Sequence, residues 1–173
     1  MLPIMLIGIP IIIACSLYLV STKPDDFRVY REITIGASRE KIASLIDDFH
    51  AWAAWSPWEK LDPAMKRTYD GPQKGVGAKY AWDSAKAGAG RMEIKSVTPQ
   101  KITLDLHFDK PMKAENVIDF IMNPDGPGTR VLWSMSGKYD YMGKLAGVFM
   151  DMDKLVGGDF EKGLADMKAA AEK

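Results

Sequence analysis

The sequence predicts an α+β fold in which a curved antiparallel sheet packs on one long C-terminal helix, preceded by an N-terminal transmembrane helix. Three observations support this prediction. Residues 1–20 carry no charged side chain, the middle of the chain holds a run of strand-like segments, and apolar residues recur every three or four positions over 142–172. Apolar residues three or four positions apart lie on one face of a helix. Short links between strands favour antiparallel neighbours.

Composition excludes several classes of function. The 173 residues carry 23 basic and 23 acidic side chains, so no net field attracts nucleic acid. One cysteine and two histidines are too few for a disulfide framework or a structural zinc site. We therefore expect no metal, no cofactor and no nucleic-acid partner. Five tryptophans and eleven methionines suit either a well-filled core or an apolar cavity.

The N-terminal segment predicts a membrane anchor. As a helix, residues 1–20 would span about 30 Å, the thickness of a bilayer's hydrocarbon core. The segment lacks a basic leading region and a small-x-small cleavage site, which favours an uncleaved anchor over a signal peptide. Lipid attachment at Cys15 is the minor alternative. We expect a single-pass cell-membrane protein with an anchor at 1–21, a linker at 22–26 and an extracytoplasmic domain at 27–173.

A strand and a helix open this domain. Residues 27–35 alternate apolar and polar side chains as a half-buried strand does, although Arg31 falls on the apolar face. Ser38 is a suitable N-cap for an amphipathic helix that ends near Phe49. The tryptophan-rich segment 50–58 contains a proline and predicts a corner between this helix and the following strands.

Six more strands are predicted in the middle of the chain. The segment 101–109 is the clearest, because Ile102, Leu104, Leu106 and Phe108 alternate strictly with polar residues. Such alternation is typical of an antiparallel sheet with one face in water. Turns rich in glycine and proline separate the segments. The six strands are expected at residues 65–69, 78–82, 91–97, 101–109, 113–122 and 129–137.

Residues 142–172 predict the long helix that covers the sheet. At ~1.5 Å per residue its length would be about 45 Å. Gly157 and Gly158 lower the helix propensity in its middle, so we expect a bend there or two abutting helices. The apolar stripe consists of Met142, Leu145, Phe149, Met152, Val156, Phe160, Leu164, Met167 and Ala171.

Short motifs accompany this order of elements: ITIGAS at 33–38, WSPW at 55–58, GVG at 75–77, GTRVLW at 128–133 and GGDF at 157–160. In these motifs the chain resembles the START-related SRPBCC superfamily, and in particular its polyketide cyclase/dehydrase-like branch, over about residues 27–172. The resemblance implies a helix-grip fold with an apolar cavity between the sheet and the C-terminal helix. The superfamily includes lipid carriers and cyclases, so the fold does not specify a reaction.

The resemblance also implies which residues would line that cavity. We expect Trp52, Trp55 and Trp58 near its mouth, because an indole ring can border both an apolar ligand and water. Every member of the set would also suit an ordinary core or a filled corner. The expected ligand-binding residues are Trp52, Trp55, Trp58, Tyr80, Trp82, Leu104, Leu106, Phe120, Trp133, Phe149 and Met152, with Met92, Ile94 and Val156 as further inward positions.

The sequence contains no visible catalytic constellation. It has no Ser-His-Asp order, no zinc-ligand spacing and no phosphate loop. His107 falls on the polar face of its strand, and His50 follows a helix C-terminus, where a cation is favoured without any catalytic role. Arg31 would either extend to the edge of the sheet or reach an anionic ligand in the cavity.

Three functions therefore remain open. The favoured one is a membrane-anchored module that binds an apolar, lipid-like or polyketide-like small molecule without catalysis. The second is a cyclase- or dehydratase-like enzyme that uses the same cavity and moves a proton with one buried carboxylate or histidine. The third is a structural or partner-binding domain with a filled core. The sequence specifies neither the ligand nor the oligomeric state.

Overall fold

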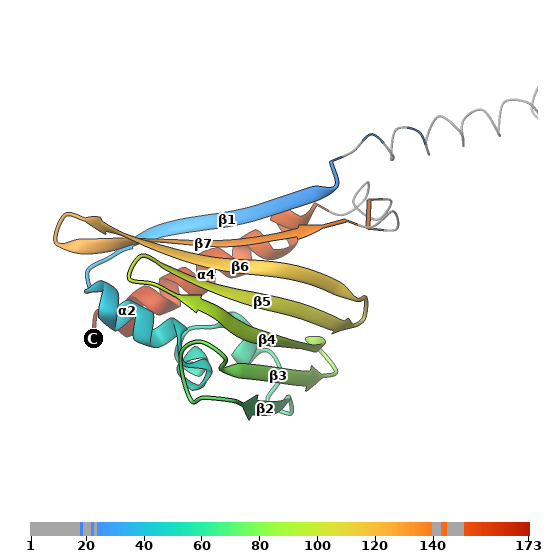
Figure 1. Ribbon diagram of the computed structural model, residues 1–173, viewed down its shortest axis with the longest axis horizontal. Coiled ribbons are helices and arrows are strands. Elements are labelled where there is room, and N and C mark those ends of the chain that lie inside the picture. The colour runs from blue at the N-terminus through green and yellow to red at the C-terminus, as the bar shows by residue number, and fades with distance from the viewer. Residues whose placement is uncertain (1–17, 19–21, 23, 140–142, 145–150) are drawn as a thin grey trace, which may run out of the picture.

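The computed structural model of this protein describes residues 18, 22, 24–139, 143, 144 and 151–173 (Figure 1). The secondary-structure elements agree with the predicted strands and first helix to within a few residues at each end. They are β1 (Asp26–Ile35), α2 (Arg39–Ile46), the 3₁₀ helices η1 (Phe49–Ala54) and η2 (Pro57–Lys60), β2 (Lys66–Asp70), β3 (Lys79–Ser84), β4 (Gly88–Val97), β5 (Lys101–Lys110), β6 (Ala114–Asp125), β7 (Gly128–Lys138) and α4 (Met152–Ala171).

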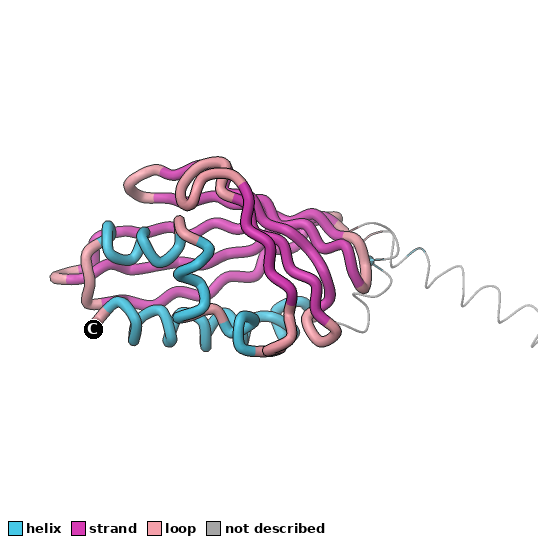
Figure 2. Tube along the Cα trace, turned by 90° about the horizontal axis from the view of Figure 1, so that it is seen from below, coloured by secondary structure: helices cyan, strands magenta, loops and turns pink. Residues whose placement is uncertain are grey.

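The strands form one seven-stranded antiparallel sheet in the order β1-β7-β6-β5-β4-β3-β2. Strands β2 to β7 each pair with their neighbours in sequence, whereas β1 pairs with β7 and forms an edge. Leu104 of β5 lies opposite Ile118 of β6, and both side chains face the interior. Figure 2 shows α2 and α4 on the same side of the sheet, which curves around them. This sheet and helix fit the predicted helix-grip arrangement.

The C-terminal helix is shorter than the sequence predicted. Asp151 is extended rather than helical, and its side chain accepts a hydrogen bond of 3.0 Å from the backbone N–H of Asp153, so it caps α4 at Met152. The rest of the predicted helix, residue 142 and residues 145–150, lies outside the described residues. Past its cap, α4 runs without interruption through Gly157 and Gly158, so two separate helices do not form there.

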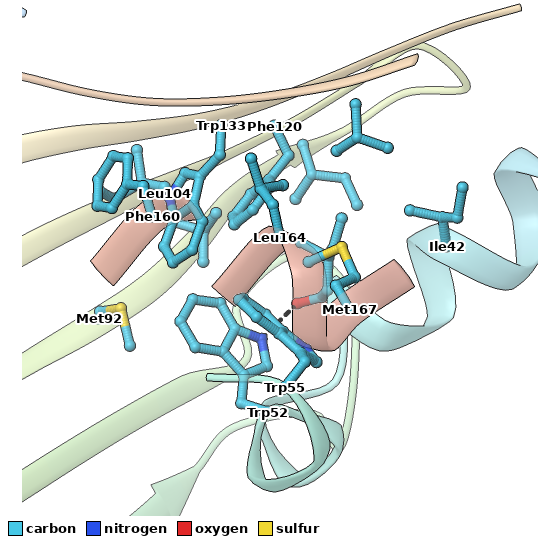
Figure 3. Close-up of a cluster of buried hydrophobic side chains, with 14 of the residues drawn as sticks. Ile42, Trp52, Trp55, Met92, Leu104, Phe120, Trp133, Phe160, Leu164 and Met167 are labelled. Carbon is cyan, nitrogen blue, oxygen red and sulfur yellow. Dashed lines mark hydrogen bonds between the residues drawn. The ribbon is translucent and has the colours of Figure 1, made fainter. Parts of the chain in front are cut away.

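One end of the space between sheet and helices is tightly filled. Leu164 and Met167 of α4 meet Ile42 and Ile46 of α2, and all four side chains are at most 1% exposed. Figure 3 shows Ile42, Leu164 and Met167 within the same buried cluster. Burial of apolar side chains at this density is the main source of stability in a domain of this size.

The other half of α4 is attached to the sheet by polar contacts. Arg31, on the inner face of β1, donates from Nε to Glu161 (2.6 Å) and from its terminal nitrogens to Asp153 (2.7 and 3.0 Å). Its guanidinium group passes over Gly157, where a Cβ atom would lie 2.2 Å from Nη2. The glycine therefore makes room for the arginine, which bonds to α4 and lies outside the cavity lining described below.

The prediction of a transmembrane helix requires correction. Within the described ranges, no helix is both long and apolar enough to cross a bilayer. Helix α2 has 8 residues, and the 20 residues of α4 include charged side chains such as Asp153 and Lys154, which are costly in hydrocarbon. The same finding corrects the predicted cell-membrane localisation, which depended on that helix. The segment 1–21 that suggested both lies outside the described residues, apart from residue 18.

Candidate functional site

A cavity of about 380 Å³ lies between the sheet and the N-terminal half of α4. Its volume falls in the range of about 300–1,000 Å³ that small-molecule sites occupy. Met152, Val156 and Phe160 of α4 form one wall, and strands β3 to β7 with the η1–η2 corner form the rest. Aromatic and sulfur-containing side chains dominate the lining: Trp52, Trp58, Met65, Tyr80, Trp82, Met92, Phe108, Trp133, Met135, Met152 and Phe160.

The structure divides the expected ligand-binding residues between cavity and core. Trp55, Leu104 and Phe120 are completely buried in the core and do not line the cavity. Phe149 lies outside the described residues. Those in the lining are Trp52, Trp58, Tyr80, Trp82, Leu106, Trp133 and Met152, and Met92 and Val156 join them.

The tryptophan-rich corner is held by the end of α2. The indole N–H of Trp52 donates to the carbonyl of Ile46 (2.9 Å), and that of Trp55 donates to the carbonyl of Leu45 (2.7 Å). The last carbonyls of a helix have no partner within the helix, so these bonds satisfy groups that would otherwise be orphaned. They also fix the direction of the chain into η2, where Trp58 reaches the cavity.

Glycines allow two aromatic rings to take their places in the cavity wall. Trp82 of β3 lies opposite Gly90 of β4, where a Cβ atom would be 2.5 Å from the Trp82 ring. Trp133 of β7 packs close to α4 at Gly163, where a Cβ atom would be 2.7 Å from ring atom Cζ3. Only glycine permits such close approach of a ring to the backbone.

Glu59 is a cavity residue to which the sequence did not point. Its side chain is 8% exposed; Oε1 accepts from the Tyr80 hydroxyl (2.5 Å) and Oε2 from Arg67 Nε (2.7 Å). Burial, followed by the bond to Glu59, raises the pKa of Tyr80, and the bond to Glu59 raises the pKa of Arg67. Tyr80 therefore remains a neutral donor. The position of η2 that turns Glu59 inward depends on the corner contacts and leaves no local sequence pattern.

The exposed residues of the lining are Leu61 of the η2–β2 link, Lys86 of the β3–β4 turn and Pro111, which follows β5. Ser84 organises that turn: its hydroxyl donates to Asp62 Oδ2 (2.7 Å) and accepts from the backbone of Lys86 and Ala87. The bond from Ser84 lowers the pKa of Asp62. The buried Asp62 carboxylate thus supports a rim that carries a cationic side chain.

Neither histidine lines the cavity. The ring of His50 lies 2.9 Å from Asp48 and stacks on Tyr69, and His107 lies 3.7 Å from Glu115 on the outer face of the sheet. Across the described part of the chain, no group of three or more His, Cys, Asp or Glu residues is placed to hold a metal ion. The cavity therefore offers an apolar surface, one paired carboxylate, a small number of neutral polar groups and, at its exposed rim, the ammonium group of Lys86.

A family model described as polyketide cyclase / dehydrase and lipid transport matches residues 26–172. The chain belongs to this family. That description spans cyclisation, dehydration and lipid transport, so membership alone does not select one of these activities. The match over residues 26–172 confirms the resemblance to the polyketide cyclase/dehydrase-like branch of the SRPBCC superfamily.

Solved structures share the fold of this family member at low identity. Protein CV1439 from Chromobacterium violaceum is 16% identical, with a TM-score of 0.62 over 87% of this chain and 99% of that one. The Aha1 dimer from Colwellia psychrerythraea is 18% identical, with a TM-score of 0.60 over 84% and 96%. Protein jhp0584 from Helicobacter pylori is 10% identical, with a TM-score of 0.64 over 87% and 90%. No curated protein matches the chain.

Proposed function

We propose that this protein binds an apolar small molecule, of a lipid-like or polyketide-like kind, in the cavity between the sheet and α4. The observation that carries the proposal is the cavity of about 380 Å³ lined mainly by aromatic and methionine side chains. A domain whose role is purely structural would gain stability by filling such a space, because interiors normally pack to the density of organic crystals. Rigid indoles and adaptable thioethers suit contact with a varied apolar ligand.

Binding is favoured over catalysis because of how Glu59 is engaged. A cyclase- or dehydratase-like reaction requires an acid or base that can exchange a proton with the substrate. Glu59 is the carboxylate in the described lining, and Arg67 and Tyr80 already use both of its oxygens. With both oxygens engaged, this arrangement suits a fixed polar wall better than a proton carrier.

Blocking the cavity tests the proposal. The neutral fluorescent probe N-phenyl-1-naphthylamine is titrated into the full chain, into Val156→Phe and into Leu155→Phe. Val156 lines the cavity, whereas the neighbouring Leu155 is 53% exposed and does not. We expect saturable binding to the parent chain and to Leu155→Phe, and an affinity at least about tenfold lower for Val156→Phe, since the added ring atoms occupy ligand space.

Two results would contradict the proposal. One is the absence of saturable binding to the parent chain. The other is equal affinity of the Val156→Phe and Leu155→Phe variants, which would place the bound probe elsewhere on the protein. Circular dichroism of both variants confirms that each is folded at the temperature of the titration.

A further inference from the structure

Ser56 is a buried serine whose hydroxyl makes no hydrogen bond to the protein. It is 2% exposed and stands at the N-cap position of η2, yet its side chain makes no capping hydrogen bond. Across the part of the chain that the structure describes, its hydroxyl has no other hydrogen-bond partner either. Most buried polar side chains in native structures are hydrogen-bonded, so this hydroxyl requires an explanation.

The local sequence has a pattern that normally engages such a hydroxyl. Residues 56–59 read SPWE, the spacing of a capping box, in which the serine hydroxyl accepts from the backbone N–H of the glutamate and the carboxylate accepts from that of the serine. Neither bond forms here. The N–H of Glu59 donates to the carbonyl of Ser56 (3.3 Å), and the N–H of Ser56 donates to the carbonyl of Trp52 (2.8 Å). The carboxylate of Glu59 is bonded to Arg67 instead, so the serine hydroxyl is left without a structural partner.

The hydroxyl of Ser56 adjoins open space. Among the described residues, two unpaired side-chain polar atoms are sealed off from any water-sized space, Asp47 Oδ1 and Trp133 Nε1, and Ser56 Oγ is not one of them. Ser56 lines the cavity and is otherwise buried, so the space beside its Oγ is the cavity. A position that admits a water molecule against Oγ also admits a ligand oxygen at hydrogen-bond distance.

We propose that Ser56 Oγ binds a neutral oxygen of the ligand, in a hydroxyl or carbonyl group carried on an otherwise apolar frame. This inference rests on the proposed function and adds the chemical class of the ligand. A serine hydroxyl both donates and accepts, so it suits either group, whereas a pure hydrocarbon leaves it unsatisfied.

An acidic group of the ligand would take a different place. Lys86 carries the ammonium group in the described lining, and its side chain is exposed at the rim. An ionised carboxylate beside Lys86 keeps its contact with water, whereas at the buried Ser56 it would lose that contact and gain only a hydroxyl as partner. A ligand with an acidic end therefore places that end at the mouth of the cavity and its neutral oxygen at Ser56.

Two probes that share one frame test the inference. Fluorene and 9-fluorenone have the same three fused rings and differ by one carbonyl group. Their affinities for the full chain are measured by displacement of N-phenyl-1-naphthylamine, for the parent and for Ser56→Ala. We expect the affinity of 9-fluorenone relative to fluorene to fall by about threefold to tenfold in Ser56→Ala, because the hydrogen bond to the carbonyl is lost. Comparing the ratios cancels the different hydration of the two probes.

Ser134→Ala is the matched control. Ser134 is also a buried serine, 3% exposed, but it does not line the cavity. Its variant should keep the affinity ratio of the parent chain. The infrared carbonyl band of bound 9-fluorenone gives a direct readout, because a hydrogen bond weakens the C=O bond. The band should lie at lower wavenumber in the parent and in Ser134→Ala than in Ser56→Ala.

Thermal melting without ligand tests the premise that the hydroxyl has no structural partner. Removal of a serine that caps a helix normally destabilises a protein. Ser56→Ala should instead melt at the temperature of the parent chain or above it, since no hydrogen bond within the protein is lost. A clearly lower melting temperature would show that the fold uses this hydroxyl, and it would overturn the inference.

The remaining outcomes distinguish the inference from the proposed function. Saturable binding of both probes, with the same affinity ratio and the same carbonyl band in the parent and in Ser56→Ala, would overturn the role of Ser56 and leave the binding function standing. Fluorene-9-carboxylate should lose affinity in Lys86→Gln but not in Ser56→Ala. The reverse pattern would overturn the neutral class. Absence of binding by all three probes would overturn the binding function and the inference with it.

Discussion

The two halves of α4 face the same sheet but are held against it in different ways. In the C-terminal half, Leu164, Met167 and Ala171 are at most 1% exposed and pack directly on the core. In the N-terminal half, Met152 and Val156 are only partly buried and border a cavity. The apolar stripe is equally regular in both halves, so the pattern of the helix does not decide which end is filled.

The difference arises from the element that closes each end. At the filled end, α2 is a regular helix whose isoleucine side chains, Ile42 and Ile46, are completely buried in the same cluster as Leu164 and Met167 of α4. At the cavity end, the chain passes through two short 3₁₀ helices, and its indole rings are fixed by bonds to the carbonyls of α2 and by ring contacts. Arg31 there replaces apolar packing with ionic hydrogen bonds to α4. Rigid rings and polar contacts keep a space open that flexible aliphatic side chains would fill.

The largest expected effect compares the two halves directly. Leu164→Ala should lower the free energy of unfolding by about 2–5 kcal/mol, because a completely buried leucine leaves a cavity when truncated. Val156→Ala should lower it by about 1 kcal/mol or less, because the removed methyl groups already face an open space. Urea denaturation measures both variants. Equal losses would show that α4 is packed alike along its whole length.

A smaller effect concerns adjacent glycines in α4. Gly158 has open space around its Cα, so Gly158→Ala should raise the free energy of unfolding by about 0.5–1 kcal/mol through helix propensity. Gly157→Ala should cancel or reverse that gain, because its Cβ displaces the Arg31 guanidinium from Asp153 and Glu161. These ion pairs are partly exposed and contribute little individually, so Gly157→Ala should melt at or below the temperature of the parent chain rather than far below it. Thermal melts that show equal gains would mean that Arg31 does not hold this half of the helix.

The smallest expected effect is a pH dependence of the same contact. The hydrogen bond from Arg31 lowers the pKa of Asp153 below its ordinary value of about 3.9. A carboxylate with a lowered folded-state pKa contributes stability above its unfolded pKa and loses that contribution as the pH falls through the folded one.

The stability difference between the parent chain and Asp153→Asn should therefore be constant from about pH 5 to pH 8 and should shrink below about pH 4. Urea midpoints measured across this range provide the test. A difference that persists unchanged in acid would mean that the ionised carboxylate is not what binds Arg31.

The sequence by itself determined the local elements, because their signals are local. The alternation of Ile102, Leu104 and Leu106 with polar residues located β5 and its inner face, and Ser38 located the start of α2, where its hydroxyl accepts from the backbone of Lys41. The three- and four-residue spacing of apolar side chains also predicted which face of α4 is buried, since Phe160, Leu164 and Met167 are all buried. The start of the helix did not follow from this spacing, because the apolar pattern continues past Asp151 to Met142, whereas the side chain of Asp151 caps the helix at Met152.

The tertiary structure decided which inward residues border the cavity and how its polar groups are used. Leu104 and Leu106 share one face of β5, yet Leu104 is in the core and Leu106 lines the cavity, because the elements opposite them differ. A period of two residues carries no information about what lies across the interior. The same holds for Glu59, which meets Arg67 and Tyr80 from other segments, and for Trp133, whose N–H lacks the backbone acceptor that Trp52 finds. Burial of a donor and distance to its acceptor are properties of the packed chain, so they exist only once the strands, the corner and α4 have come together.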